Sequence, residues 1–282
     1  MTYAGLLKQG ETELREAGIR DAKTDAYLLL NFLSGKDRTF LSVHGDTEVE
    51  GDIIENYVNY IDRRKAHIPL QYITGETEFM GLRFEVDENV LIPRVDTEFL
   101  TEEALIVTDD GAEVLDLCTG SGCILLSVMC YKNNISGTGS DLSDAALKVA
   151  ERNAERLAEQ GRLRGTVRFC KSDLFERISG TFDVLISNPP YIRTAVIEEL
   201  EEEVRDHEPR MALDGLEDGL AFYRAIAGEA YRYLAGEGRI LLEIGYDQGE
   251  AVRRIFEEKG YRDVRIKKDY AGNERVLSCL NR

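Results

Sequence analysis

The 282-residue sequence has none of the long hydrophobic runs that mark a membrane protein. Its apolar runs, such as Ile124–Met129 and Ile240–Leu242, are far shorter than the ~20 residues of a membrane-spanning helix. The N-terminal segment becomes polar too soon for a signal peptide. We therefore expect a cytoplasmic protein that does not associate with membranes.

Residues that bind metals or form disulfides are also scarce. The five cysteines are an odd number and include no C-x-x-C pair, which fits a reducing compartment better than a disulfide framework. The three histidines include no H-E-x-x-H motif, so we expect no dedicated metal site.

Basic residues are too few for a protein that follows a nucleic-acid backbone. The sequence has 35 Lys and Arg against 53 Asp and Glu, a formal net charge of −18. Affinity for phosphates comes from Lys and Arg that displace counterions, so this balance disfavours a broad nucleic-acid surface but does not exclude a local basic patch.

The residues that are present fall into three parts. Residues 1–75 carry apolar stripes at helical spacing, which predicts a small helical domain. From Gln71 to Pro93 β-branched and aromatic residues alternate with polar ones, with glycines at Gly75 and Gly81, which predicts a β-hairpin. We place this hairpin at residues 76–95 as the linker to a catalytic domain over 96–282.

Strand and helix patterns alternate through the third part, which predicts an α/β fold with a mainly parallel, Rossmann-like sheet covered by helices on both faces. The last two strands follow each other without a helix and predict an antiparallel edge pair. The expected strands are Glu113–Cys118, Gly137–Leu142, Thr166–Lys171, Phe182–Ser187, Arg239–Ile244, Arg262–Lys267 and Arg275–Leu280, and the expected helices are Gly122–Tyr131, Ser143–Gln160, Leu220–Leu234 and Gln248–Lys259.

A glycine-rich turn follows the first of these strands. Gly120 and Gly122 let the backbone approach a ligand, and the helix that begins there offers free N–H groups. Leu125 stands where a dinucleotide fingerprint would have its third glycine, which weakens a prediction of NAD or FAD. Asp141 ends the next strand, where a carboxylate can accept both ribose hydroxyls of an adenosine-containing ligand.

The segment Asn188-Pro189-Pro190-Tyr191 follows the strand Phe182–Ser187 and favours a particular chemistry. The two prolines make the backbone rigid and remove two donors. The Asn188 side-chain oxygen and the Pro189 carbonyl can accept both hydrogens of a planar –NH2 group, and Tyr191 offers a flat face for stacking. The segment is therefore predicted to bind an amide or an exocyclic amine.

The glycine turn, Asp141 and the Asn-Pro-Pro-Tyr segment resemble class I methyltransferases that use S-adenosylmethionine to methylate a planar nitrogen. Further segments along the chain resemble the HemK/PrmC family, whose members methylate the glutamine side-chain amide in the Gly-Gly-Gln loop of peptide chain release factors. These segments are Pro69–Gly75, Phe79–Leu82, Ile92–Arg94, Asp96–Glu98, Glu208–Arg210, Asp218–Leu220 and Glu243–Gly245 with Gln248.

The resemblance implies a fold and roles for individual residues. It implies a helical N-terminal domain that docks the release factor, a hairpin and a Rossmann-like catalytic domain, with S-adenosylhomocysteine as the product of the cofactor. Val95 and Leu216 depart from the family pattern, which has proline and glycine there. The implied cofactor residues are Cys118, Thr119, Gly120, Ser121 and Gly122 at the methionine end and ribose, Asp141 at the ribose and Leu174 at the adenine. Asn188 is implied to contact both the cofactor and the substrate. The implied substrate residues are Asn188, Pro189, Pro190 and Tyr191.

Two other functions remain open on the sequence. An adenine-N6 methyltransferase of RNA or DNA shares the Asn-Pro-Pro-Tyr segment, but the acidic charge disfavours it. A non-catalytic binding protein would have no need of an intact Asn-Pro-Pro-Tyr segment. Cys118 has no identifiable histidine partner, so it is not expected to be a nucleophile. The acidic stretch over 197–218 is either a solvated helix and loop or a rim that attracts a basic protein partner.

Overall fold

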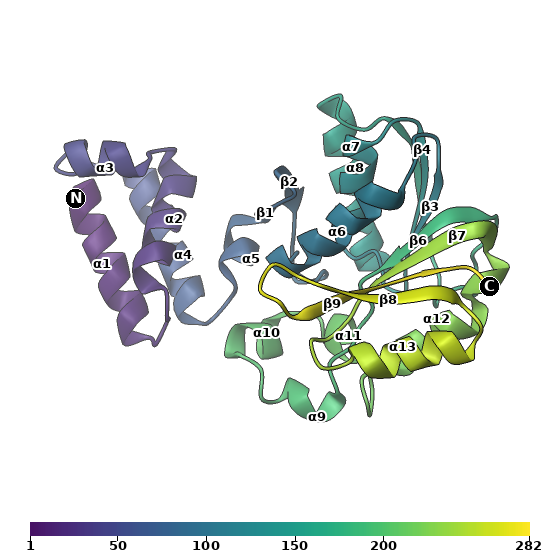
Figure 1. The fold of residues 1–282 in the computed structure, drawn as a ribbon. Helices are drawn as coiled ribbons and strands as arrows, with labels where there is room; N and C mark the ends of the chain where they lie inside the picture. The colour runs from purple at the N-terminus through teal and green to yellow at the C-terminus, as the bar shows by residue number, and fades with distance from the viewer. The chain divides into compact units, whose positions relative to one another are not determined.

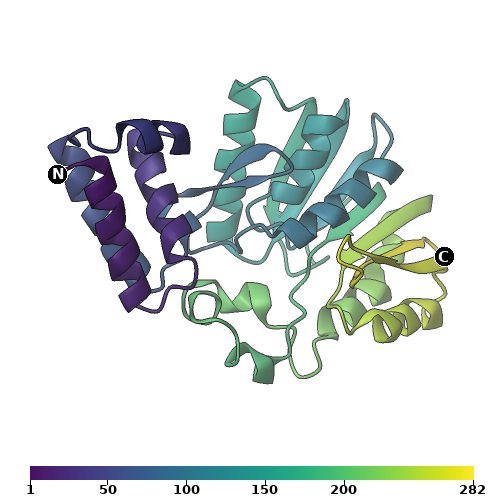
Figure 2. The same cartoon turned by 60° about the vertical axis from the view of Figure 1, so that its left-hand side comes forward.

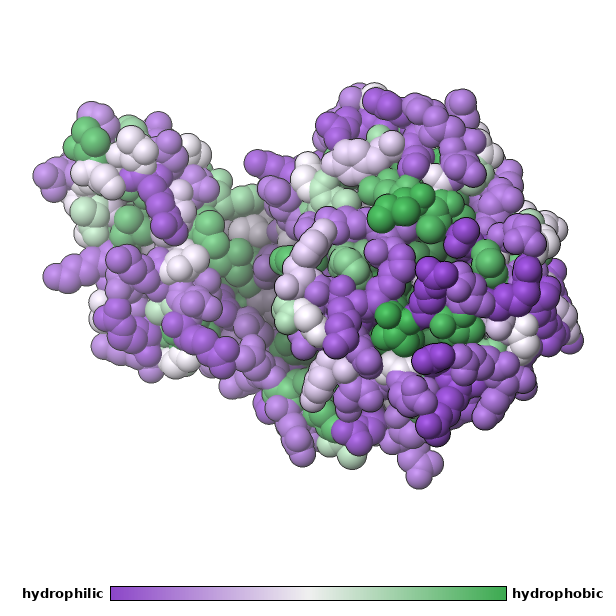
Figure 3. Space-filling view, viewed as in Figure 1, coloured by the Kyte–Doolittle hydropathy of each residue, from purple (hydrophilic) through white to green (hydrophobic).

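The computed structural model describes residues 1–282, which form two compact units (Figure 1). The first, here called the helical unit, consists of Met1–Gly75 and Glu201–His207. The second, the sheet unit, consists of Glu76–Leu200 and Glu208–Arg282. No helix in either unit combines the length and the apolar character that crossing a membrane requires. Hydrophilic side chains cover most of the face seen in Figure 3, and hydrophobic residues appear there in separate patches.

The helical unit is built from amphipathic helices that bury their leucines against one another. Thr2 caps α1 by accepting from the Gly5 N–H, and Asp37 caps α3 by accepting from the Phe40 N–H at 2.7 Å. The buried Tyr57 donates its hydroxyl to the Ala26 carbonyl. The helices are α1 (Tyr3–Glu16), α2 (Ala22–Ser34), α3 (Arg38–His44), α4 (Gly51–Lys65), α5 (Leu70–Thr74) and α10 (Glu202–His207).

Ion pairs explain why Glu201–His207 belongs to the helical unit. Arg64, which is buried, pairs with Asp25 at 2.7 Å and with Glu203 at 2.9 Å. Arg20 pairs with Glu201 at 2.9 Å. This part of the acidic stretch over 197–218 is therefore neutralised by basic residues that come from the first 75 residues of the chain.

The predicted hairpin is shorter than its sequence pattern. Gln71–Thr74 belongs to helix α5, so the strand-like alternation that begins at Gln71 does not describe this segment, which lies within residues 1–75. Pro69 has φ fixed at −53° before the helix, and Gly75 ends it with φ of +76°, which glycine adopts without strain. The hairpin itself consists of β1 (Glu76–Phe79) and β2 (Leu82–Glu85), paired antiparallel.

The sheet unit contains a seven-stranded sheet in the order β5-β4-β3-β6-β7-β9-β8. The pairs from β5 to β7 are parallel, and β9 is antiparallel to both β7 and β8. This confirms the predicted α/β class and the antiparallel edge pair. The strands are β3 (Glu113–Leu117), β4 (Ile135–Asp141), β5 (Gly165–Lys171), β6 (Phe182–Ser187), β7 (Leu234–Glu243), β8 (Arg262–Lys268) and β9 (Glu274–Leu280).

Helices cover both faces of this sheet, as Figure 2 shows. One buried cluster joins the sheet to α6 (Val95–Val107), α7 (Cys123–Tyr131) and α8 (Asp144–Glu159), and another joins it to α12 (Ala221–Glu229) and α13 (Gly249–Glu258). Strand β4 lies on one side of β3 and β6 lies on the other, so the strand order reverses at β3. A crevice forms at such a point, here at the carboxyl ends of β3, β4 and β6.

Three local features of the sheet unit differ from the sequence predictions. Helix α6 was not predicted, because its buried face includes Thr97, Thr101 and Glu103. The helix expected to reach Leu234 ends at Glu229 and is followed by a single 3-10 turn before β7. The segment after β6 contains the short helices α9 (Thr194–Ile197) and α11 (Arg210–Leu213), on either side of α10.

Candidate active site

A cavity of about 480 Å³ lies at the carboxyl ends of β3, β4 and β6, and all the residues that line it belong to the sheet unit. It brings together most of the residues predicted from the sequence. Gly122, Pro189 and Tyr191 do not line the cavity. The predicted residues that do are Cys118, Thr119, Gly120, Ser121, Asp141, Leu174, Asn188 and Pro190.

The glycine turn, Cys118–Gly122, takes the chain sharply from β3 into α7. Cys118, Gly120 and Gly122 all have positive φ, at +57°, +55° and +78°. A Cβ on Gly122 would lie 3.0 Å from Leu126 and 3.2 Å from Ala150, so a side chain there is both strained and crowded. Gly122 therefore packs against Leu126 and Ala150 on the side of the turn away from the cavity, while Cys118–Ser121 line the cavity.

Asp141 connects the glycine turn to the end of β4. Its Oδ2 accepts from the Gly120 N–H at 3.0 Å, and its Oδ1 accepts from the Ser143 N–H at 2.9 Å. Ser143, and not Asp141, caps α8 by accepting from Ala146. Burial raises the pKa of Asp141, and these backbone donors oppose the rise. Asp141 lines the cavity, and each of its carboxylate oxygens can accept a further hydrogen bond.

Two buried polar atoms beside the turn have no hydrogen-bond partner, Asp116 Oδ1 and Ser121 Oγ. The other oxygen of Asp116 accepts from the Thr119 hydroxyl at 2.6 Å. Burial raises the pKa of Asp116 to about 7. Burial also raises the pKa of the Cys118 thiol, which argues against a nucleophilic thiolate. Ser121 lines the cavity and Asp116 does not, so the Ser121 hydroxyl is the unpaired group that a polar ligand could reach.

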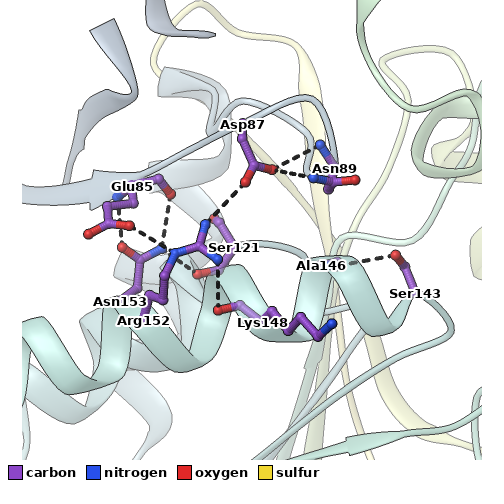
Figure 4. Close-up of polar contacts among 9 residues, drawn as sticks. All are labelled: Glu85, Asp87, Asn89, Ser121, Ser143, Ala146, Lys148, Arg152 and Asn153. Carbon is purple, nitrogen blue, oxygen red and sulfur yellow. Dashed lines mark hydrogen bonds and ion pairs between the residues drawn. The ribbon is translucent and has the colours of Figure 1, made fainter.

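Asn153 of α8 fastens the glycine turn to the hairpin (Figure 4). Its Nδ2 donates to the Ser121 carbonyl at 2.9 Å and to the Glu85 carbonyl at 3.0 Å, and its Oδ1 accepts from the Glu85 N–H at 2.6 Å. The neighbouring Arg152 pairs with Glu85 and with Asp87. The side chain of Asn153 thus holds strand β2 against the turn.

The Asn188 loop, Asn188–Tyr191, begins at the carboxyl end of β6. The Asn188 Nδ2 donates to the hydroxyl of the buried Thr97 at 3.3 Å, which leaves the side-chain oxygen as an acceptor. The Tyr191 hydroxyl donates to Glu243 Oε1 at 3.1 Å, and its ring packs against the core on one face of the sheet. The Tyr191 carbonyl accepts from Gln248. Both ends of the loop are therefore held by side chains from other elements.

Residues of the acidic stretch over 197–218 form a further wall of the cavity. The buried side chain of Glu208 pairs with Arg94 and accepts from the Ile92 N–H at 3.2 Å. Leu216 lines this wall with φ of +68°, a conformation in which glycine is favoured. Val95 is the exposed first residue of α6, a position where proline is favoured. The backbone thus explains why the family pattern has proline at the position of Val95 and glycine at the position of Leu216.

The sequence reasoning assigned no role to Thr97, Asn153, Glu208 or Glu243. Glu208 and Glu243 stand in segments that resemble the family, but no local pattern indicates what they contact. Thr97 is 91 positions from Asn188, and Glu243 is 52 positions from Tyr191. Only the fold brings these pairs together.

Comparisons with known proteins define the class of this fold. The model of the methyltransferase small domain matches residues 95–205, and that of the PrmC N-terminal domain matches residues 5–75. A solved methyltransferase from Pyrococcus furiosus superposes with a TM-score of 0.53 at 20% identity, over 80% of this chain and 98% of that one. The sheet unit therefore has the fold of a class I methyltransferase.

Closer relatives identify the family. The release factor glutamine methyltransferase of Clostridium acetobutylicum is 39% identical over 272 residues, which are 95% of this chain and 94% of that protein. The protein of the same name from Agrobacterium fabrum is 39% identical over 98% of this chain and 96% of its own length. This chain belongs to the release factor glutamine methyltransferase family, which confirms the resemblance to the HemK/PrmC family.

Proposed function

We propose that this protein transfers a methyl group from S-adenosylmethionine to the side-chain amide nitrogen of the glutamine in the Gly-Gly-Gln motif of peptide chain release factors. The observation that carries the proposal is the Asn188 side chain, which lines the cavity with its nitrogen bound to Thr97 and its oxygen free to accept. Family membership over nearly the whole chain supports the same substrate.

The residues around the glycine turn fit the proposed cofactor. Asp141 would accept ribose hydroxyls, and Leu174 would flank the adenine. The unpaired hydroxyl of Ser121, which lines the cavity, would provide a polar group near the methionine end. Cys118, Thr119 and Gly120 would line the methionine end and ribose, and Gly122 would keep the turn in its left-handed conformation.

An amide nitrogen is a weak nucleophile, because its lone pair is delocalised, so the protein contributes mainly by positioning and electrostatics. S-adenosylmethionine, when bound, supplies an electrophilic methyl group on a sulfonium. The Asn188 oxygen would accept one amide hydrogen of the substrate. The family resemblance assigns the other hydrogen to the Pro189 carbonyl, although Pro189 itself does not line the cavity. Accepting both hydrogens would raise electron density on the nitrogen. Pro190 lines the cavity, and Tyr191 fixes the end of the loop on Glu243. No side-chain nucleophile is needed.

The helical unit would contribute to docking the release factor. The match of residues 5–75 to the PrmC N-terminal domain supports this role. A substrate of this kind would be encountered in the cytoplasm, where translation terminates. The net charge of −18 disfavours the alternative, adenine methylation of RNA or DNA, because affinity for a nucleic-acid backbone depends on Lys and Arg.

The experiment that tests the proposal supplies labelled S-adenosylmethionine with a recombinant release factor, the same factor with Ala in place of the Gly-Gly-Gln glutamine, ribosomal RNA and DNA. We expect label on the unmodified factor alone. Label on RNA or DNA alone would contradict the proposal and favour the adenine methyltransferase. Cofactor binding without any transfer would favour a binding protein.

A further inference from the structure

Gln248 lies just before the first residue of α13 and does not line the cavity. Its backbone carbonyl accepts from the Val252 N–H at 2.9 Å and so belongs to the start of the helix. Its half-buried side chain makes no capping bond within α13. The side chain instead contacts the backbone of three other segments, which makes Gln248 a candidate for a role beyond the helix.

The three contacts use both ends of the Gln248 amide. Its Oε1 accepts from the Gly245 N–H at 2.9 Å. Its Nε2 donates to the Tyr191 carbonyl at 2.9 Å and to the Gly219 carbonyl at 3.3 Å. A carboxylate could accept from the N–H group but could donate to neither carbonyl, whereas an amide satisfies all three partners. The contacts therefore explain why this position holds glutamine.

The Asn188 loop is a segment that needs support of this kind. Pro189 and Pro190 have no backbone N–H group, so the loop cannot be held there through donors. Gln248 holds the backbone of the loop through the Tyr191 carbonyl, whereas the Tyr191 hydroxyl is bound separately by Glu243. The backbone direction is thus fixed three residues after Asn188.

On its other side, Gln248 contacts a segment that continues the cavity wall. Residues 213–219 lie beside residues 191–194, with the Ile192 N–H donating to the Leu213 carbonyl at 3.0 Å and the Gly215 N–H donating to the Ile192 carbonyl at 2.8 Å. Two residues of the first segment line the cavity. The Gln248 amide therefore joins the end of the Asn188 loop to this wall.

Gly219 shows how closely the joined segments approach. A Cβ on Gly219 would lie 2.4 Å from the Tyr191 carbonyl oxygen and 2.7 Å from Gln248 Nε2. Its φ is +74°, a conformation that also favours glycine. The junction therefore has no room for a side chain, and the position of the Tyr191 carbonyl is closely defined.

On the basis of the proposed function, we propose that Gln248 is a positioning residue for methyl transfer. It holds the backbone of the Asn188 loop against the cavity wall, so that the acceptor oxygen of Asn188 stays where the substrate amide must bind. Gln248 lies outside the cavity and acts through the Tyr191 carbonyl. A small displacement of a group that orients a substrate is enough to slow the reaction strongly.

The test compares Gln248→Glu and Gln248→Met with the wild-type protein. Gln248→Glu keeps the length of the side chain but has no hydrogen to donate to the two carbonyls at neutral pH. Gln248→Met removes all three contacts without adding a charge, so it serves even if Gln248→Glu folds poorly. We expect kcat for methyl transfer to a release factor to fall about 10- to 100-fold in both variants. The Kd of S-adenosylmethionine should stay near the wild-type value, because the glycine turn is unchanged.

Asn281→Asp is a matched control. The buried Asn281 amide also joins backbone groups, since its Nδ2 donates to the carbonyls of Leu234 at 3.2 Å and Ala235 at 3.1 Å, and its Oδ1 accepts from the Arg282 N–H at 2.9 Å. None of these residues lines the cavity. The control should lower the melting temperature and leave kcat unchanged. Wild-type kcat in both Gln248 variants, or an equal loss of kcat in Asn281→Asp, would overturn the inference.

Hydrogen exchange, measured by mass spectrometry without substrate, tests the junction itself. The N–H groups of Ile192, Thr194 and Gly215 donate across the two segments in the wild-type protein. Peptides that contain them should exchange faster in both Gln248 variants and at the wild-type rate in Asn281→Asp. Unchanged exchange in the Gln248 variants would overturn the inference even if they were slow. If the wild-type protein modified no release factor, the proposed function would fail, and the exchange rates would still decide whether Gln248 holds the Asn188 loop.

Discussion

The glycine turn and the Asn188 loop lie on the same cavity but are held in different ways. The glycine turn depends on backbone conformation and on near neighbours, such as the contact of Gly120 with Asp141. The Asn188 loop depends on side chains from α6 and β7, which are distant in the sequence. The comparison indicates that changes at the turn should affect cofactor binding, whereas changes at the loop should affect turnover.

The largest expected effect is that of Asn188→Ala. The variant loses the acceptor for the substrate amide, so kcat for methyl transfer should fall about 10²–10³-fold. Cofactor affinity, measured by calorimetry, should change much less, because the glycine turn is intact. A variant that lost cofactor binding and turnover in equal measure would break the distinction between the two regions.

Asp141→Asn tests the opposite region. Asparagine can still accept from one N–H group but loses the charge, so the Kd of S-adenosylmethionine should rise roughly ten- to hundredfold. The kcat at saturating cofactor should stay close to that of the wild-type protein. Burial raises the pKa of Asp141, so this carboxylate takes up a proton at a higher pH than an ordinary aspartate does. As the pH is lowered, the affinity of the wild-type protein for the cofactor should therefore begin to fall at that higher pH. A fall in kcat without a change in Kd would contradict this assignment.

Asp116→Asn addresses the stability of the turn. The pKa of Asp116 in the folded protein is about 7 against an ordinary value of 3.8, so between these values the folded state binds one more proton than the unfolded state. The free energy of unfolding should therefore decrease as pH rises from about 4 to about 7, by about 1.4 kcal/mol per pH unit from this group. Urea unfolding at several pH values should show a smaller decrease in the variant, and parallel curves for the two proteins would count against an uncharged Asp116.

The smallest expected effect is that of Leu216→Gly. Leu216 has φ of +68°, which costs a non-glycine residue about 1–2 kcal/mol, so glycine should raise the free energy of unfolding by about 1 kcal/mol. Thermal unfolding measures the gain. Gly180→Ala, at another exposed position with positive φ, is the control and should have the opposite effect. A destabilised Leu216→Gly variant would mean that contacts of the leucine outweigh its backbone strain.

The sequence allowed the prediction of features that depend on short segments. The strand before the glycine turn, Asp141 at the next strand end and the Asn-Pro-Pro-Tyr segment each carry a local signal, and the parallel sheet with its antiparallel edge followed from the alternation of elements. Helix α6 was missed because polar residues such as Thr97 lie on its buried face. Contacts such as those of Thr97 and Glu243 were beyond reach, since they depend on which strand ends become neighbours.

The division of the helical unit along the chain has a consequence for synthesis. Arg64 is made early, but its partner Glu203 follows only after the whole of Glu76–Leu200. On the ribosome, the first 75 residues can form helices, yet the buried Arg64 has only Asp25 as a counterion until α10 emerges. The helical unit therefore completes its folding after most of the sheet has been synthesised, and a chain shortened to begin at Glu76 would leave Glu201–His207 without its basic partners.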